Sequence, residues 1–195
     1  MPLGAFKAAL MGTAGVSTAD VVLLSTTTAS DDATIDITSG IDSTYGEYIF
    51  KLYNIHPATD STDFSFQVNA AGGSGFNETI TSTVFRAYGP ESGTANLAYD
   101  TSRDQAQGTA YQPLSGEVGN GNDESLAGEL HLFNPASTTY VKHFIWRGTV
   151  YFSEDANYAN FNAGYINTTT AIDEISFKFA SGNVESGKIK MWGVK

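Results

Sequence analysis

Three histidines, His56, His131 and His143, are the side chains best suited to hold a metal ion, because imidazole is the commonest neutral metal ligand. They lie on three separate segments without the short spacing of a metal-binding motif, and His56 directly precedes Pro57. The chain has no cysteine, which excludes disulfide frameworks, thiolate zinc sites and cysteine nucleophiles. We therefore predict no metal centre and no cofactor.

Oxygen ligands for calcium are concentrated in the run Asn120-Gly121-Asn122-Asp123-Glu124. The run lacks the regular ligand spacing of a calcium loop, so a solvated turn is the favoured interpretation.

Paired carboxylates would permit glycoside hydrolysis, which uses two acids about 5 to 10 Å apart. Four carboxylates are candidates for such a pair: Glu78, Glu129, Glu154 and Asp173. Each lies in or beside an alternating segment, where an outward polar residue is expected in any case, and no Gly-x-Ser-x-Gly turn accompanies them. We therefore predict no catalytic residues and no enzymatic activity.

Aromatic side chains with polar tips either fill a core or contact sugars and partner proteins. Those on predicted strands are expected in the core, whereas Tyr99, Tyr111, Tyr158 and Tyr165 fall in or beside predicted loops and are candidates for contact. Trp192 shares the polar face of its strand with Lys188 and Lys190, so we expect a subunit contact or an overlying loop to shield it.

The elements that must position these residues are predicted to be β-strands. Apolar residues alternate with polar ones at Ile175, Phe177 and Phe179, and again at Ile189 and Met191 after a Gly-bearing turn. This pattern predicts a β-hairpin whose apolar face, with both phenylalanines inward, packs on a second sheet. Further strands are predicted at 33–38, 46–55, 64–68, 79–88, 126–133 and 138–152, with 46–88 forming a meander.

Polar or Gly- and Asn-rich segments are predicted to be loops, at 26–32, 89–124 and 155–167, with room for one short helix in the second. Eight or nine strands with long loops favour an all-β, jelly-roll-like antiparallel sandwich of two sheets, formed as one domain by 26–195. Residues 1–25 form an extended arm in this interpretation, which is expected to anchor the protein. Its apolar residues Phe6, Leu10 and Met11 are further contact candidates.

The acidic balance of the chain limits its partners. Ten Lys and Arg against 21 Asp and Glu give a net charge of -11, which repels nucleic acid and anionic lipid surfaces. No stretch is long and apolar enough to span a bilayer, and the first 16 residues lack the pattern of a signal peptide.

Much of the chain resembles small structural proteins of marine tailed bacteriophages. The runs that carry the resemblance are GEYIFKLYNIHPATDSTDFSFQV, FNETITSTVFRAY, GELHLFNPASTTYVKHF and AGYINTTTAIDEISFKFASGNVESGKIKMWGVK. They cover roughly residues 46–195, and the most specific of them is the ending. The resemblance implies a β-sandwich virion component without enzymatic activity, assembled in the host cytoplasm.

Three functions follow as expectations. The first is a virion structural protein on the particle exterior, in a capsid decoration or a tail or fibre, which contacts other virion proteins and copies of itself, most simply as a trimer. The second is a carbohydrate-binding module for host surface glycans, and the third is a glycan-cleaving enzyme.

Overall fold

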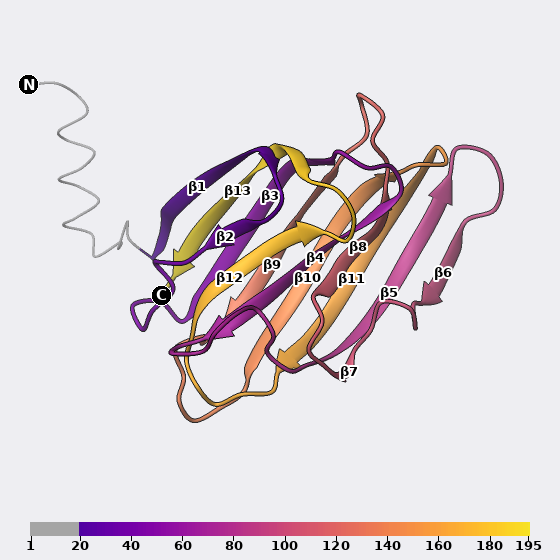
Figure 1. The fold of residues 1–195 in the computed structure, drawn as a ribbon. Coiled ribbons are helices and arrows are strands. Elements are labelled where there is room, and N and C mark those ends of the chain that lie inside the picture. Colours follow the sequence, from indigo (N-terminus) through magenta and orange to yellow (C-terminus); the bar gives the residue numbers. More distant parts are fainter. Residues whose placement is uncertain (1–19) are drawn as a thin grey trace, which may run out of the picture.

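The computed structural model describes residues 20–195, and in this part of the chain thirteen β-strands and no helix form. Figure 1 shows the strands in two layers that face each other. The larger layer contains β1 (Val21–Asp32), β13 (Val184–Val194), β3 (Glu47–Pro57), β9 (Leu126–Phe133), β10 (Lys142–Phe152), β11 (Ala156–Ile166), β5 (Ile80–Pro90), β6 (Asn96–Tyr99) and β7 (Ala106–Gly108). The smaller contains β8 (Gln112–Val118), β4 (Thr62–Ala70), β12 (Ile172–Phe179) and β2 (Ile35–Ile37). One residue pair, Phe152 with Val118, links β10 to β8 and nearly closes the sandwich into a barrel.

The strand order confirms the predicted jelly roll. The sheet β1-β13-β3-β9 faces the sheet β2-β12-β4-β8, and the chain changes layer at each connection from β1 to β5 and again between β7 and β8, β8 and β9, β11 and β12, and β12 and β13. The remaining strands are additions to this framework. The β10–β11 hairpin and strands β5 to β7 extend the larger sheet beyond the smaller one (Figure 1).

The core lies between the layers because each strand turns its apolar alternate residues inward. Phe177 of β12 is fully buried, with its ring centroid 5.7 Å from that of Phe50 on β3 and 6.1 Å from that of Phe64 on β4. Phe179, Ile189 and Met191 are also buried. The inward orientation predicted for these residues is confirmed.

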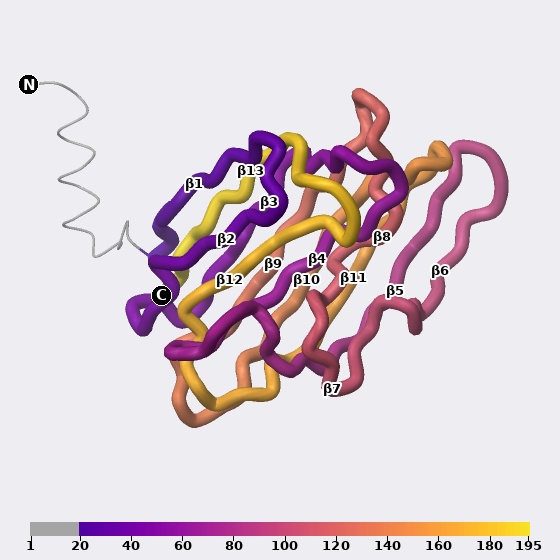
Figure 2. The backbone as a smooth tube through the Cα atoms, viewed as in Figure 1, coloured from indigo at the N-terminus to yellow at the C-terminus, as the bar shows by residue number. Residues whose placement is uncertain are grey.

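The predicted hairpin between β12 and β13 is wrong. β12 pairs with β2 and β4, whereas β13 pairs with β1 and β3, so the two strands lie in opposite layers. Figure 2 shows the chain crossing between the layers after β12. Alternation fixes which face of a strand is apolar but not which strand is its neighbour, and either arrangement places both apolar faces inward.

The predicted meander over 46–88 fails for the same reason. Its three strands exist as β3, β4 and β5, but none of them pairs with the next one.

Three predicted loops are also wrong, because segments 26–32, 89–124 and 155–167 contain strands in the structure. Residues 26–32 lie within β1, whose Thr- and Ser-rich sequence pairs with β13 along its length. The second contains β6, β7 and β8, and no helix forms there. The third is β11, paired on both sides.

Polar inward side chains explain why β11 was missed. Asn160 and Asn162 are buried on its inner face, where their amides donate to Ser115 Oγ at 3.2 Å and to the Pro113 carbonyl at 2.6 Å. The burial therefore alternates along β11 while the hydropathy does not.

Candidate functional site

A shallow hollow of about 500 Å³ lies on the outer face of the larger sheet. We call it the sheet hollow, and its outward-facing side chains are Lys51, Tyr53, Ala127, Glu129, Arg147, Thr149, Ala159 and Phe161. They come from β3, β9, β10 and β11, which are hydrogen-bonded in that order. Three interstrand spacings make the hollow about 14 Å long across the strands.

The strand register builds the hollow from two cross-strand rows. One row runs from Lys51 through Glu129 and Arg147 to Phe161 and carries all the charged groups. The next row runs through Ala127, Thr149 and Ala159, whose small side chains leave the depression. These residues are far apart in the sequence, and only the sheet brings them together.

Aromatic rings stand at the two ends of the hollow. Tyr53 on β3 is 44% exposed, and Lys190 Nζ lies 5.5 Å from its ring centroid. Phe161 on β11 stacks on Phe85 with a centroid distance of 5.0 Å, and the Arg147 guanidinium lies 5.9 Å from its ring. Both rings therefore have a cation close by, and Phe161 is also supported by a second ring.

Glu129 is the carboxylate of the hollow. It pairs with Lys51 at 3.4 Å and approaches His131 Nε2 at 3.6 Å, while His131 Nδ1 is hydrogen-bonded to Glu47. These pairs are exposed to solvent, so they contribute little to stability. They do hold the Glu129 carboxylate in place at the rim.

A second surface lies at the free end of the same sheet. We call it the edge patch, formed by Val21, Leu23, Ile49 and Trp192, with Leu23, Trp192 and Ile49 side by side on β1, β13 and β3. Val21 is 54% exposed and Leu23 is 43% exposed. Trp192 is half-buried, and its indole N–H is shielded from solvent without a hydrogen-bond partner among residues 20–195.

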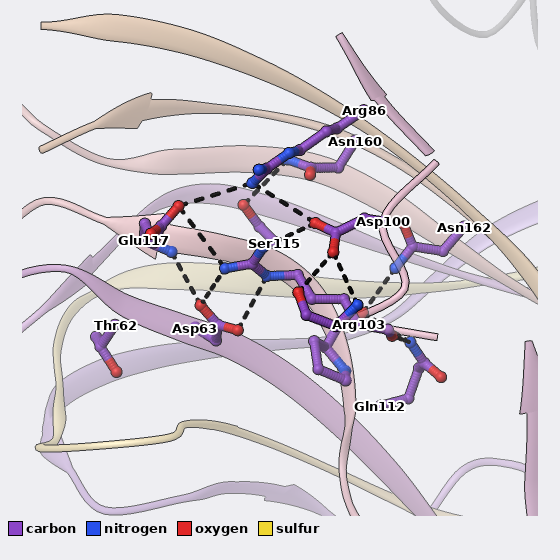
Figure 3. Close-up of polar contacts among 12 residues, drawn as sticks. Thr62, Asp63, Arg86, Asp100, Arg103, Gln112, Ser115, Glu117, Asn160 and Asn162 are labelled. Carbon is purple, nitrogen blue, oxygen red and sulfur yellow. Dashed lines mark hydrogen bonds and ion pairs between the residues drawn. The ribbon is translucent and has the colours of Figure 1, made fainter. Parts of the chain in front are cut away.

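A largely buried ionic network joins β4, β5, β8 and the segment after β6 (Figure 3). Arg103 donates through Nε and Nη2 to both carboxylate oxygens of Asp63 on β4 at 3.0 Å, and through Nη1 to Asp100 at 2.8 Å. Asp63 also accepts the Glu117 N–H at 3.0 Å, and Arg86 lies 3.5 Å from Asp100. The network therefore ties four segments together.

The network shifts the ionisation of its members. Burial is the largest effect on Asp100 and disfavours its charge, but hydrogen bonds from Ser102 and Arg103 together outweigh burial and lower the pKa of Asp100. Burial is also the largest effect on Arg103 and opposes its charge, but Asp63 and Asp100 together outweigh burial, so the pKa of Arg103 is raised further. Both groups stay charged at neutral pH, which fits a clamp and not a proton donor.

The aromatic residues predicted for contact do not form one site. Tyr99 lies on β6, is 52% exposed and donates to Asp104. Tyr111 is half-buried under Lys178 and hydrogen-bonded to Ser176, and Tyr165 is half-buried on β11.

Tyr158 corrects the prediction. It is buried on the inner face of β11 beneath Arg86, because the segment is a strand and not a loop, so it lies on no contact surface. Phe6, Leu10 and Met11 lie outside the described residues.

The residues considered for chemistry are dispersed. His56, at one end of β3, contacts the Glu124 backbone carbonyl through Nδ1 and the Glu185 carboxylate through Nε2. His131 lies on the outer face of β9, and His143 is exposed beside Tyr165. Residues 20–195 contain no group of three His, Asp or Glu side chains placed to hold a metal ion. The Glu124 carboxylate accepts the Gly121 N–H within its own turn.

The four carboxylates predicted as a possible hydrolytic set occupy three places. Glu129 lies on the outer face and Glu154 in the turn after β10. Glu78 accepts the Ala70 N–H at the end of β4, and Asp173 lies in the bulge of β12 beside the same residue.

The sheet hollow was missed by sequence reasoning, which looked for contact residues in loops. Tyr53 could have indicated the hollow from the sequence. It lies an even number of positions from Glu47 and Lys51, which point outward on β3, and an odd number from inward Tyr48 and Phe50. A large aromatic residue at an outward position of a strand indicates a surface that binds a ligand or a partner.

Comparisons with known proteins add no family to these observations. No helix in residues 20–195 is long and apolar enough to cross a membrane. No protein-family model matches the chain, and no curated protein matches it significantly.

Proposed function

We propose that this protein is a non-enzymatic structural subunit on the exterior of a bacteriophage particle, in a capsid decoration or a tail or fibre. The resemblance of residues 46–195 to phage structural proteins gives the setting. The observation that carries the proposal is the edge patch, an apolar surface at the free edge of the larger sheet. Large exposed apolar side chains that lie together favour a protein contact.

The contact we propose is with the first 19 residues of a neighbouring copy. Within residues 20–195, no strand pairs with the outer edge of β1, and an unpaired edge offers a row of backbone N–H and C=O groups to an extended chain. Phe6, Leu10 and Met11 supply apolar side chains for the edge patch. Exchange of such arms around a closed ring joins copies symmetrically, and a trimer is the form we propose because exterior phage proteins generally follow the local symmetry of their lattice or fibre.

The other end of β1 is less suited to pairing. The strand ends there with Asp31 and Asp32. Charged residues are a usual means by which edge strands avoid unwanted partners. The contact is therefore directed to the Val21 end, which adjoins residue 20.

Light scattering at micromolar concentration tests the assembly. Leu23→Asp should convert the oligomer to monomer, because a carboxylate would be buried in the contact without a partner. Leu97→Asp is the matched control, since Leu97 is 69% exposed on β6, away from the edge patch. A wild-type protein that is monomeric alone and with purified particles would contradict the proposal.

Removal of residues 1–19 separates folding from attachment. We expect the shortened protein to unfold cooperatively and to join neither its own copies nor the particle. Loss of cooperative unfolding would show that these residues belong to the core, which would contradict their role as an arm.

Carbohydrate binding is a second candidate function, and the sheet hollow is the observation that favours it. Two aromatic rings with a carboxylate and a hydroxyl group between them suit the apolar faces and hydroxyl groups of a sugar chain. Reproducible binding on a glycan array that Tyr53→Ala abolishes would support this function, and equal binding by the variant would reject the hollow as its site.

A further inference from the structure

We infer that the sheet hollow binds a short acidic oligosaccharide, one that carries uronate carboxylates or sulfate esters. The inference rests on the second candidate function, carbohydrate binding, and is independent of the particle assignment. It adds the chemical class of the ligand, which the charges around the hollow indicate.

Cations gather on this face of a strongly acidic protein. The chain has a net charge of -11, yet Lys51, Lys188, Lys190 and Arg147 all project from the outer faces of β3, β13 and β10. Lys188 is paired across the strands with Tyr53, and Lys190 with Lys51. A cationic area on an otherwise acidic surface attracts anions locally while the rest of the protein repels them.

Three of these cations have no carboxylate to neutralise them among residues 20–195. The ion pairs engage Lys51 through Glu129 but leave Arg147, Lys188 and Lys190 unpaired. Arg147 and Lys190 instead lie against aromatic rings of the hollow, Phe161 and Tyr53 respectively. A guanidinium is suited to two-point binding of carboxylate or sulfate oxygens, and an ammonium to a single strong contact.

The rings provide the surface for the uncharged part of the ligand. The C–H groups of a sugar ring carry slight positive charge and pack on the electron-rich face of an aromatic ring. Phe161 is already stacked on Phe85, so it loses little freedom on binding. The small side chains of Ala127 and Ala159 let a sugar ring approach the sheet between the two aromatic residues.

Glu129 distinguishes a sugar from other polyanions. Its carboxylate accepts hydrogen bonds from sugar hydroxyl groups, and the neighbouring Thr149 hydroxyl, which donates its hydrogen to Asn157, also accepts. A phosphate backbone offers oxygens that repel a carboxylate at the same distance. The arrangement of cation, carboxylate and ring along about 14 Å therefore fits an acidic oligosaccharide better than single-stranded nucleic acid.

Isothermal titration calorimetry with four hexamers tests the inference: an oligogalacturonate, a sulfated oligoglucan, the unsulfated oligoglucan and a single-stranded oligonucleotide. We expect at least one acidic oligosaccharide to bind about tenfold or more tightly than the neutral one, which corresponds to the loss of one charge-assisted contact. The affinity should fall as sodium chloride is raised, because the cations are exposed. The two acidic arms show which anionic group is preferred.

Variants locate the site. Tyr53→Ala and Arg147→Ala should each weaken binding about tenfold or more, as expected for central contacts. Tyr140→Ala is the control, because Tyr140 is 73% exposed and lies outside the hollow. Unchanged thermal unfolding would show that each variant is folded.

The remaining outcomes overturn the inference in distinguishable ways. Equal binding of neutral and acidic hexamers would reject the acidic ligand and keep carbohydrate binding, whereas no binding of any oligosaccharide at millimolar concentration would reject both. Tighter binding of the oligonucleotide would assign the hollow to nucleic acid. Dissociation of the oligomer by Tyr53→Ala would make this face a subunit contact instead.

Discussion

Replacement of Arg103 by leucine removes the cation that joins Asp63 and Asp100. Removal of one partner from a buried ion pair costs about 3 to 5 kcal/mol, because the remaining charge is left without compensation. Here the lower end applies, about 3 kcal/mol, since Asp63 is partly exposed to water and Asp100 keeps its hydrogen bonds from Ser102. Domains of this kind are stable by about 5 to 15 kcal/mol, so the change should be readily measured.

The pH dependence gives this prediction its sign. The pKa of Asp100 is lowered in the folded wild type, so its contribution to stability is present above the ordinary pKa of an aspartate and is lost as pH falls through the folded value. In the variant the lowering of the pKa by Arg103 is lost, so Asp100 contributes less stability above the ordinary pKa of an aspartate. The stability difference between the two proteins should therefore shrink from pH 7 to about pH 3.

Urea unfolding at the two pH values measures this difference. Arg147→Leu serves as the matched control, because Arg147 is exposed on β10 and has no carboxylate partner among residues 20–195, and its loss should change stability by no more than about 0.5 kcal/mol. A loss below about 1 kcal/mol for Arg103→Leu, or an equal loss at both pH values, would refute the clamp.

Three further predictions concern the core and the outer face. Phe177→Ala should cost about 3 to 5 kcal/mol of unfolding free energy, because Phe177 is fully buried. Lys178→Ala should cost only about 0.5 to 1 kcal/mol, for the contact of its ammonium with the Tyr111 ring at 4.2 Å. Equal losses for the two variants in chemical denaturation would contradict the assignment of strands to layers. Gly148→Ala should cost about 1 to 3 kcal/mol in thermal unfolding, because the added Cβ would collide with the Trp146 ring. Gly89→Ala is the control and should be close to neutral, since its Cβ would meet no atom within 4 Å. An alanine at 148 without loss of stability would contradict the packing of Trp146 against Gly148. In a Trp146→Phe background, the emission of half-buried Trp192 should shift to the blue and resist quenching on assembly, and a red, freely quenched signal in the oligomer would mean that no surface covers it.

The sequence predicted the strands whose inward residues are apolar. β3, β4, β9, β10, β12 and β13 show this alternation, and the burial of Phe177 and Met191 follows from it. β8 and β11 were missed because Gln112, Asn160 and Asn162 point inward and find hydrogen-bond partners there. A buried polar side chain looks like an exposed one in a hydropathy pattern, and only its partner in space distinguishes the two.

Strand pairing and the sheet hollow could not be predicted from the sequence, and the reason is the same for both. Alternation is a property of one strand, whereas pairing depends on competition among all strands for neighbours. Lys51, Glu129, Arg147 and Phe161 come from four strands and meet only through their register. Within the hollow, the outward position of Tyr53 could have been predicted from the alternation along β3 alone.

The central claim, that the protein is an exterior subunit of a phage particle, is tested most directly by a search for the protein in purified particles. Purified particles should contain the protein as an abundant component by mass spectrometry, and antibody fragments against an exposed segment, such as the one around Tyr140, should decorate intact particles at symmetric positions in electron micrographs. A protein found in infected cells but absent from purified particles, or reached by the antibody only after particles are broken, would contradict an exterior structural role.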